Sequence, residues 1–338
     1  MRPSRAIAFL TLASTFMALA ISLACGKPQP APAAAAASAG APPLLDPALT
    51  AYAGPQVSGE VASIGSDSMD PLIQLWADDF RALNPAVSFR IVSKGSATAP
   101  RALLAGDSLI GQMSRPMNEA ELAAFQEKFG YAPTQVIVAA DALAIYVNAG
   151  NPLPKLSLAQ VDAIFGRERK AGYPKDLRGW GDFGLENGWQ TKVIQPYGRN
   201  ENSGTRAFFQ EHVLLKGAYR PEVKALDDQF ATVEAVASDP DGIAYGPIQH
   251  KVQGVRAVPL ENGGAAVMPS MAAILAGDYP LTRFLYIYVN KAPGKPLPGA
   301  VRAFLAYAIS RNGQASVASF GAIPIRADVA QSDLAKLD

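Results

Sequence analysis

The chain has 338 residues, of which 49% are hydrophobic and 17% charged, so it can bury a core larger than one small domain needs. Its 30 Lys and Arg residues nearly balance 29 Asp and Glu residues, which leaves a formal charge of +1. This balance excludes an overall basic surface for nucleic acid and an acidic, disordered chain. From the length and the hydrophobic content, we expect two lobes. Any charge used in function must be local.

The N-terminus has the pattern of an export signal. Two arginines precede an apolar run, Ala6 to Ala24, which ends in small residues before Cys25. This end resembles the bacterial lipoprotein motif, whose cysteine is lipidated and becomes the mature N-terminus, although Ser22 stands where the motif usually has Leu, Val or Ile. We expect a signal peptide at 1–24 and lipidation at Cys25; cleavage nearby without lipidation and an uncleaved membrane helix are the alternatives.

A Pro- and Ala-rich stretch follows the single cysteine. Residues 27–47 contain six prolines, a composition that stays extended and builds no core. We expect residues 25–56 to form the lipidated cysteine and a tether that holds a domain away from a membrane. Since the chain has no second cysteine, no disulfide is expected, and stability must come from the core.

From about Val57 onward, short β-rich runs alternate with helical ones, which is typical of α/β folds. The predicted strands are 61–64, 87–92, 109–113, 135–139, 143–147, 193–197, 242–245 and 284–289. The predicted helices are 71–83, 100–105, 119–129, 204–215 and 299–310. No internal repeat interrupts this order.

Three of the predicted helices begin after hydroxyl-bearing residues. Ser68, Ser96 and Ser203 each precede a helix start, and each segment follows a predicted strand. A helix N-terminus exposes unpaired backbone N–H groups and the positive end of the helix dipole, so it suits an anion. One such start indicates only a helix cap, but three in this setting favour an anion site.

Read in chain order, these segments resemble the phosphate-binding proteins of bacterial phosphate ABC transporters. The resemblance runs collinearly from roughly Gly59 to Ile325. It includes four loops that correspond to the family's ligand loops: Gly65 to Met69, Lys94 to Thr98, Ile110 to Pro116 and Gly198 to Thr205. Further similar segments are Asp141 to Ala144, Asn148 to Leu153, Gly242 to Tyr245 and several C-terminal stretches.

The resemblance implies an α/β, two-lobed periplasmic binding protein of the class II type, with two crossover segments and a ligand cleft between the lobes. Lobe one is then expected at 57–145 plus 250–338, and lobe two at 146–249. The cleft closes on its ligand by hinge motion. The implied protein is a monomer without a cofactor.

The fourth loop carries the most specific chemistry. Arg199 offers a charge and a planar set of N–H donors that fit an oxyanion. Ser203, Gly204 and Thr205 add hydroxyls, backbone N–H groups at a helix start and room for close approach. In the family, an acid two residues after the arginine orients it, and Glu201 has that spacing.

The resemblance also implies donors from the opposite lobe. The Ser68 hydroxyl, the Met69 backbone N–H and the Ser96 hydroxyl match the family's donor positions. In the third loop, Ser114 and Arg115 are further candidates. Phosphate that enters a cleft loses its hydration, so fixed donors such as these must replace the lost hydrogen bonds.

A proton acceptor is needed to distinguish phosphate from sulfate. In some family members an aspartate of the third loop accepts the phosphate proton, and sulfate at neutral pH has no proton to donate. The third loop of this chain has no aspartate. Asp67 is therefore the first candidate acceptor and Asp141 the second.

Other conspicuous residues have simpler interpretations. Trp180 and Trp189 flank a glycine-rich turn, and we expect them to pack in lobe two. The chain has two histidines, His212 and His250, and one cysteine, and these residues do not have the spacing of metal ligands. No metal site is therefore predicted.

The predicted function is the capture of inorganic phosphate at the periplasmic face of a bacterial membrane and its delivery to the membrane permease of an ABC transporter. One alternative is an exported phosphatase on the same scaffold, but the chain shows no activated nucleophile with a base or a metal beside it, so no enzyme is predicted. The other alternative is a binding protein for a different tetrahedral oxyanion, such as sulfate or molybdate.

Overall fold

The computed structural model describes residues 45–250, 252–261 and 263–338. The expected signal peptide at 1–24, the expected lipidation at Cys25 and most of the expected tether lie outside the described residues. Within the described ranges, none of the helices is both long enough and apolar enough to cross a membrane.

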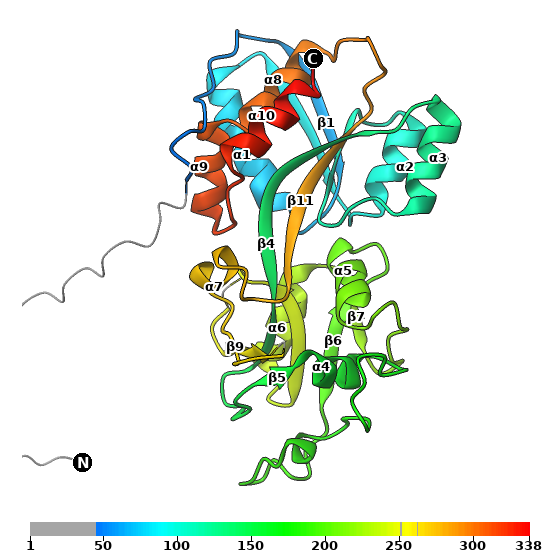
Figure 1. Cartoon of the computed structure of the whole chain (residues 1–338), viewed down its shortest axis with the longest axis vertical. Coiled ribbons are helices and arrows are strands. Elements are labelled where there is room, and N and C mark those ends of the chain that lie inside the picture. The colour runs from blue at the N-terminus through cyan, green and yellow to red at the C-terminus, as the bar shows by residue number, and fades with distance from the viewer. Residues whose placement is uncertain (1–44, 251, 262) are drawn as a thin grey trace, which may run out of the picture. The chain divides into compact units, whose positions relative to one another are not determined.

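Residues 45–338 form an α/β unit in which strands and helices alternate (Figure 1). The strands are β1 (Gly59–Gly65), β2 (Val87–Ser93), β3 (Ile110–Met113), β4 (Thr134–Asn148), β5 (Leu156–Ser157), β6 (Gln195–Arg199), β7 (Lys224–Leu226), β8 (Gly242–Pro247), β9 (Val255–Val258), β10 (Leu260–Glu261) and β11 (Thr282–Val289). The helices are α1 (Asp70–Leu83), α2 (Thr98–Ala105), α3 (Glu119–Phe129), α4 (Leu158–Phe165), a 3-10 turn at Trp180–Phe183, α5 (Gly204–His212), α6 (Gln229–Ser238), α7 (Met271–Leu275), α8 (Gly299–Ala308), α9 (Arg311–Phe320) and α10 (Ala327–Ala335).

Strand β4 corrects one prediction, because it is a single strand of 15 residues where two strands were expected. It pairs with β11 over Thr134–Ala142 and then with β8 and β9 over Leu143–Asn148. The expected break contains Asp141, whose charge interrupts the apolar pattern. In the structure Arg283 of β11 is the direct partner of Asp141 in the sheet and forms an ion pair with it, so the strand continues.

The two largest hydrophobic clusters both include residues of this strand, and they define what we call the first and second halves of the unit. The first cluster contains Trp76, Phe80 and Phe304 and is covered by α1, α8, α9 and α10. The second cluster contains Phe209 and Tyr245, whose rings stack at 4.0 Å, and also Trp180, with Trp189 packed against it. The packing role predicted for the two tryptophans is therefore confirmed.

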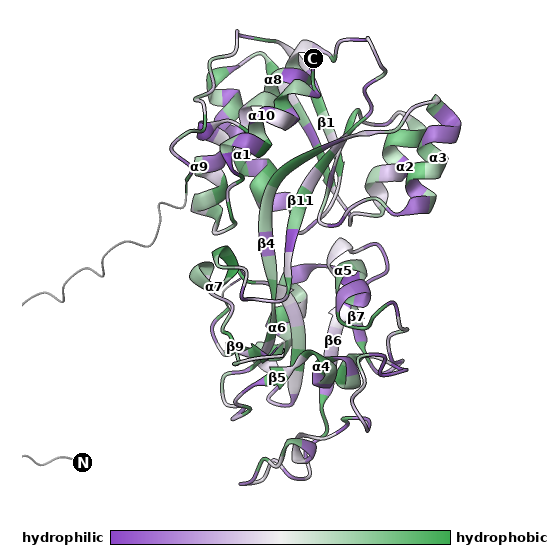
Figure 2. Cartoon of the chain, in the orientation of Figure 1, coloured by the Kyte–Doolittle hydropathy of each residue, from purple (hydrophilic) through white to green (hydrophobic). Residues whose placement is uncertain are grey.

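Strands β4 and β11 run from one half into the other (Figure 1). Both are largely hydrophobic, with a hydrophilic band midway along their course (Figure 2). Strands β9 and β10 come late in the chain but belong to the second half, because β9 pairs with β4, and Val258, Leu260 and Leu281 lie in the second cluster.

The sheet order brings loops from distant parts of the chain together. Strand β1 pairs in parallel with β2 and with β3, so the carboxyl ends of all three lie at one edge. In the second half, β6 pairs in parallel with β7 and β8. Loops at the carboxyl ends of strands are where open α/β sheets bind ligands. The first two predicted ligand loops begin at the ends of β1 and β2, and the other two include β3 and the end of β6 together with the residues that follow.

Candidate anion-binding site

The loops of the two halves meet at close range. The backbone N–H of Ala97, after β2, donates to the carbonyl of Asn202, after β6, at 3.1 Å. A side chain at Gly95 would overlap the Asn202 carbonyl, and one at Gly204 would overlap the hydroxyls of Ser96 and Ser114. The glycines are therefore needed for this close approach of the loops.

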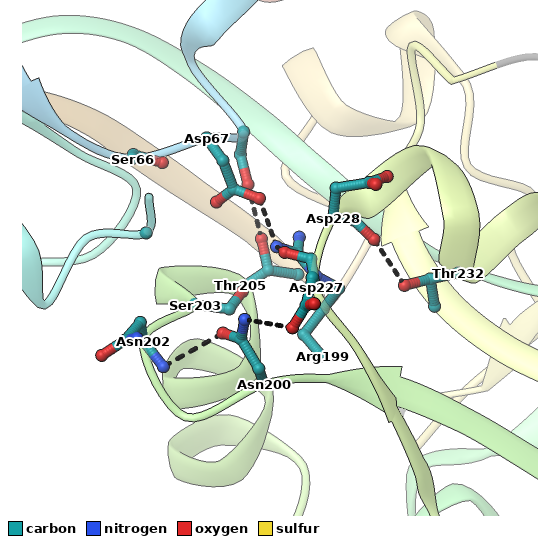
Figure 3. A network of polar contacts seen from close by, with 12 residues as sticks. Ser66, Asp67, Arg199, Asn200, Asn202, Ser203, Thr205, Asp227, Asp228 and Thr232 are labelled. Carbon is teal, nitrogen blue, oxygen red and sulfur yellow. Dashed lines mark hydrogen bonds and ion pairs between the residues drawn. The ribbon is translucent and has the colours of Figure 1, made fainter. Parts of the chain in front are cut away.

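Arg199 is the centre of the site. It ends β6, and only 1% of the residue is exposed. Its Nη2 donates to the Asp67 carboxylate and, at 3.0 Å, to the Asp227 carbonyl, while its backbone N–H donates to the Tyr245 hydroxyl at 3.3 Å (Figure 3). Its Nε and Nη1 are buried and have no hydrogen-bond partner in the described part of the chain.

Asp67 faces Arg199 from the first half. One carboxylate oxygen binds the guanidinium, whereas the other, Oδ1, is buried and finds no partner among the described residues (Figure 3). Leaving a buried polar atom without a hydrogen bond costs about 1–3 kcal/mol, more when the group is charged. The paired side chains of Arg199 and Asp67 thus keep both unpartnered donors and an unpartnered acceptor within the described structure, which suits a ligand that has both bare and protonated oxygens.

Buried hydroxyls surround this pair. The Ser68 and Thr205 hydroxyls lie 2.9 Å apart and join the two halves. A second group consists of Ser66, Ser96 and Ser114, in which the Ser114 hydroxyl lies 3.1 Å from that of Ser66 and 3.2 Å from that of Ser96. Because one hydroxyl bond uses one proton, the Ser68–Thr205 pair keeps one proton that can turn toward a ligand.

Two of the three predicted caps serve another purpose. Helices α1 and α2 have Met69 and Ala97 at their N-caps and no side-chain capping bond. The Ser68 and Ser96 hydroxyls, expected to introduce these helices, instead bond to Thr205 and Ser114. The Met69 side chain lies in the first cluster, so only its backbone is available to a ligand.

The third predicted helix start is a true cap. The Ser203 hydroxyl accepts from the Arg206 backbone N–H at 3.3 Å, and Gly204 and Thr205 begin α5. The Arg206 side chain donates to the Arg199 carbonyl at 3.1 Å and packs 3.9 Å over the ring of Tyr219. Burial, with the neighbouring Tyr245, raises the pKa of Tyr219 well above its usual value, so its hydroxyl stays protonated and donates to the Arg206 carbonyl at 2.8 Å.

The structure places Glu201 and Arg115 away from the Arg199 side chain. Glu201 is exposed and forms no hydrogen bond or ion pair with Arg199 in the described structure; Asp67 and the Asp227 carbonyl hold the guanidinium instead. Arg115 forms two bonds of 2.7 Å to Glu121. Both residues line a cavity of about 870 Å³ on the α3 side of the loops, so neither contributes to the Arg199 cluster in this arrangement.

Asp141 lies beside the site, but its carboxylate is fully engaged. Its two oxygens accept from Arg283 Nε at 2.6 Å and Nη2 at 2.9 Å, and both side chains are 2% exposed. Arg283 also donates from Nη1 to the Thr205 hydroxyl at 3.0 Å. Arg283 was not predicted, because an arginine in an apolar strand gives no local sign of its distant partner.

No metal chemistry is apparent in the described ranges, where no three His, Cys, Asp or Glu side chains gather closely enough to hold an ion. The two histidines have packing roles: His212 lies against Phe208 with ring centroids 4.2 Å apart, and His250 against Phe230 at 4.3 Å. The site therefore offers buried donors on Arg199 and one buried acceptor on Asp67.

Comparisons with known proteins agree with this geometry. A family profile described as a PBP superfamily domain matches residues 50–312. The phosphate-binding protein PstS of Pseudomonas aeruginosa is 43% identical over 296 residues, which cover 87% of this chain and 92% of that protein. Protein SphX of Synechococcus elongatus is 28% identical over 272 residues, 79% of this chain and 78% of that protein.

Solved structures share the fold. A putative phosphate ABC transporter substrate-binding protein with bound phosphate from Clostridium perfringens superposes with a TM-score of 0.67 at 24% identity, covering 79% of this chain and all of the other. An ABC-type phosphate transport receptor from Vibrio cholerae gives a TM-score of 0.62 at 20% identity, with 79% and 100% covered. At these identities the likeness establishes the fold alone.

Proposed function

Since this chain belongs to the PBP superfamily, and within it to the PstS-like phosphate-binding proteins, we propose that it binds inorganic phosphate between its two halves and delivers it to the membrane permease of an ABC transporter. The ligand is expected to contact Arg199, Ser203, Gly204 and Thr205 from the second half. From the first half we expect it to contact the Asp67 carboxylate, the Ser68 and Ser96 hydroxyls and the Met69 backbone N–H.

One observation carries the proposal: Arg199 and Asp67 are joined through Nη2 and one carboxylate oxygen, while Nε and Nη1 of Arg199 and Oδ1 of Asp67 are buried and have no partner among the described residues. The two nitrogens can donate to phosphate oxygens, and Oδ1 can accept the proton that monohydrogen phosphate retains. Sulfate has no such proton at neutral pH and would place an oxygen against the carboxylate. These contacts support a preference for phosphate and support Asp67, rather than Asp141, as the acceptor.

Calorimetric titration of the purified protein with phosphate and with sulfate tests the proposal. We expect phosphate to bind with a dissociation constant of about 1 µM or lower and sulfate to bind at least about tenfold more weakly. An absence of binding heat and of competition by phosphate, or equal affinity for the two anions, would refute it. Incubation with a phosphomonoester should release no product, and a turnover that Arg199→Ala abolishes would favour the phosphatase alternative.

The lobes of the proposed protein are taken to be the two halves of the unit. Lobe two then includes residues 255–281 rather than ending at 249, because β9 pairs with β4 and the residues after it pack in the second cluster. Lobe one contains β1 to β3, α1 to α3 and α8 to α10. Closure would bend β4 and β11 where they pass between the clusters.

Export and anchoring complete the proposal. The N-terminal pattern supports export to the periplasmic side of a bacterial membrane, with lipidation at Cys25 followed by a Pro- and Ala-rich tether. We propose that the protein acts as a monomer. Mass spectrometry of the mature N-terminus tests the lipid, since an unmodified Cys25 would refute it. Light scattering tests the oligomeric state.

A further inference from the structure

Arg283 is a buried cation outside the predicted set of ligand residues. Its position in β11 pairs with Asp141 in β4, and both carboxylate oxygens hold its Nε and Nη2. Two bonds to a fixed carboxylate set the plane of a guanidinium. The direction of the third nitrogen, Nη1, is thereby fixed as well, and it points at the Thr205 hydroxyl oxygen 3.0 Å away.

This third bond constrains the protons of two hydroxyls. A guanidinium only donates, so one lone pair of the Thr205 oxygen is always occupied. The Ser68 hydroxyl, 2.9 Å from the same oxygen, either donates to it or accepts from it. If Ser68 donates, the Thr205 proton is left over; if Thr205 donates, the Ser68 proton is left over. In both cases one hydroxyl proton has no partner among these three side chains.

We propose that Arg283 is a positioning residue for oxyanion binding, which fixes the Ser68–Thr205 pair so that its remaining proton is donated to the ligand. The inference rests on the proposed function, because the ligand is taken to be phosphate. The three elements involved are separate: Ser68 follows β1, Thr205 begins α5, and Arg283 lies on a strand shared by both halves. Arg283 therefore stabilises the arrangement of the loops that receive the anion.

A purely structural role for Arg283 makes a different prediction. The ion pair with Asp141 alone would stabilise the crossing strands whatever residue stood at 205. If Arg283 acts through the Thr205 hydroxyl, its contribution to phosphate affinity must depend on that hydroxyl. A double-mutant cycle measures this dependence directly.

The cycle uses one double variant in which Asp141→Asn and Arg283→Gln are made together. Its effect on phosphate binding is measured in two backgrounds, the natural sequence and Thr205→Val. Replacing both charged partners leaves no unpaired buried charge, so the fold should be retained. We expect the exchange to weaken phosphate binding about tenfold in the natural background and less than about threefold beside Thr205→Val. Phosphate affinity is measured by calorimetry, and thermal unfolding without ligand checks the fold.

Equal weakening in both backgrounds, or none in either, would overturn the inference. If the paired exchange does not fold, Arg283→Lys in the same two backgrounds replaces it, because an ammonium keeps the charge beside Asp141 but loses the fork that reaches Thr205; the same coupling is expected, and its absence overturns the inference. A natural protein that does not bind phosphate refutes the proposed function itself, whereas binding without coupling refutes only the role of Arg283.

Discussion

Two buried Arg–Asp pairs lie within the same site, and they are built differently. Arg283 and Asp141 face each other across adjacent strands, and both carboxylate oxygens are bonded. Arg199 and Asp67 come from loops of opposite halves, and each keeps buried polar atoms without a partner in the described structure. The first pair is complete as it stands, whereas we expect a ligand to complete the second, so unsatisfied atoms are our criterion for telling a binding pair from a supporting one.

The largest expected effect is a loss of phosphate affinity when the Arg199–Asp67 pair is broken. Arg199→Ala should weaken phosphate binding by about 4 kcal/mol, roughly a thousandfold, because it removes a buried charge and its free donors. The stability of the ligand-free protein should change much less. Calorimetry measures the affinity, and Arg81→Ala, an exposed arginine of α1, is the matched control. Near-natural affinity in Arg199→Ala would remove the basis for calling this pair the ligand site.

For the Arg283–Asp141 pair, we expect the main effect of a substitution on the stability of the ligand-free protein. Arg283→Ala leaves the Asp141 carboxylate buried without its partner, so the free energy of unfolding should fall by about 3 kcal/mol. Urea denaturation of the ligand-free protein measures this. Arg302→Ala removes an exposed ion pair with Asp338 and should cost less than about 1 kcal/mol. Equal losses in the two variants would contradict the supporting role.

Asp67→Asn sharpens the comparison by changing selectivity. The amide is neutral, so it accepts a phosphate proton more weakly and no longer repels a sulfate oxygen. The ratio of phosphate to sulfate affinity should fall about tenfold, equivalent to one charged hydrogen bond. Competition titrations at neutral pH measure it, with Asp78→Asn, an exposed carboxylate of α1, as the control. An unchanged ratio would assign the proton acceptor to another group.

The smallest expected effect concerns the surrounding hydroxyls. Ser96→Ala removes one neutral donor, and the Ser114 hydroxyl remains in place. Phosphate affinity should fall by about 1 kcal/mol, roughly fivefold. Ser319→Ala, an exposed serine of α9, should have no effect on binding. A loss as large as that of Arg199→Ala would mean that the hydroxyls, rather than the Arg199–Asp67 pair, dominate affinity.

Much of the fold could be predicted from local pattern. Helix α3 begins and ends where the sequence indicated, because Asn118 and Glu121 form a capping box and Gly130 ends the helix. The late helices α9 and α10 were missed. The period of α10 is weak, whereas α9 is as amphipathic as the predicted α8. Strand β4 appeared as two strands because the partner that neutralises Asp141 lies 142 residues away.

The site shows the same limit. Arg199, Ser203 and Thr205 lie together because they are close in sequence, so a local motif sufficed to group them. The partner of Arg199 could not be chosen by spacing, because Glu201 turns outward while Asp67 reaches it across 132 residues. Which hydroxyls cap helices and which face the site was likewise decided by contacts between the halves, at Ser68 and Ser96.

The two ion pairs also determine the net charge of their side chains at the site. Arg199 with Asp67 and Arg283 with Asp141 carry no net charge. If phosphate binds here as proposed, we expect hydrogen bonds to hold it, and these weaken as donor and acceptor move apart. A long-range attraction between unlike charges would contribute little, because the two pairs are neutral. A slight parting of the halves would then suffice to release the ion, so tight capture does not prevent rapid unloading.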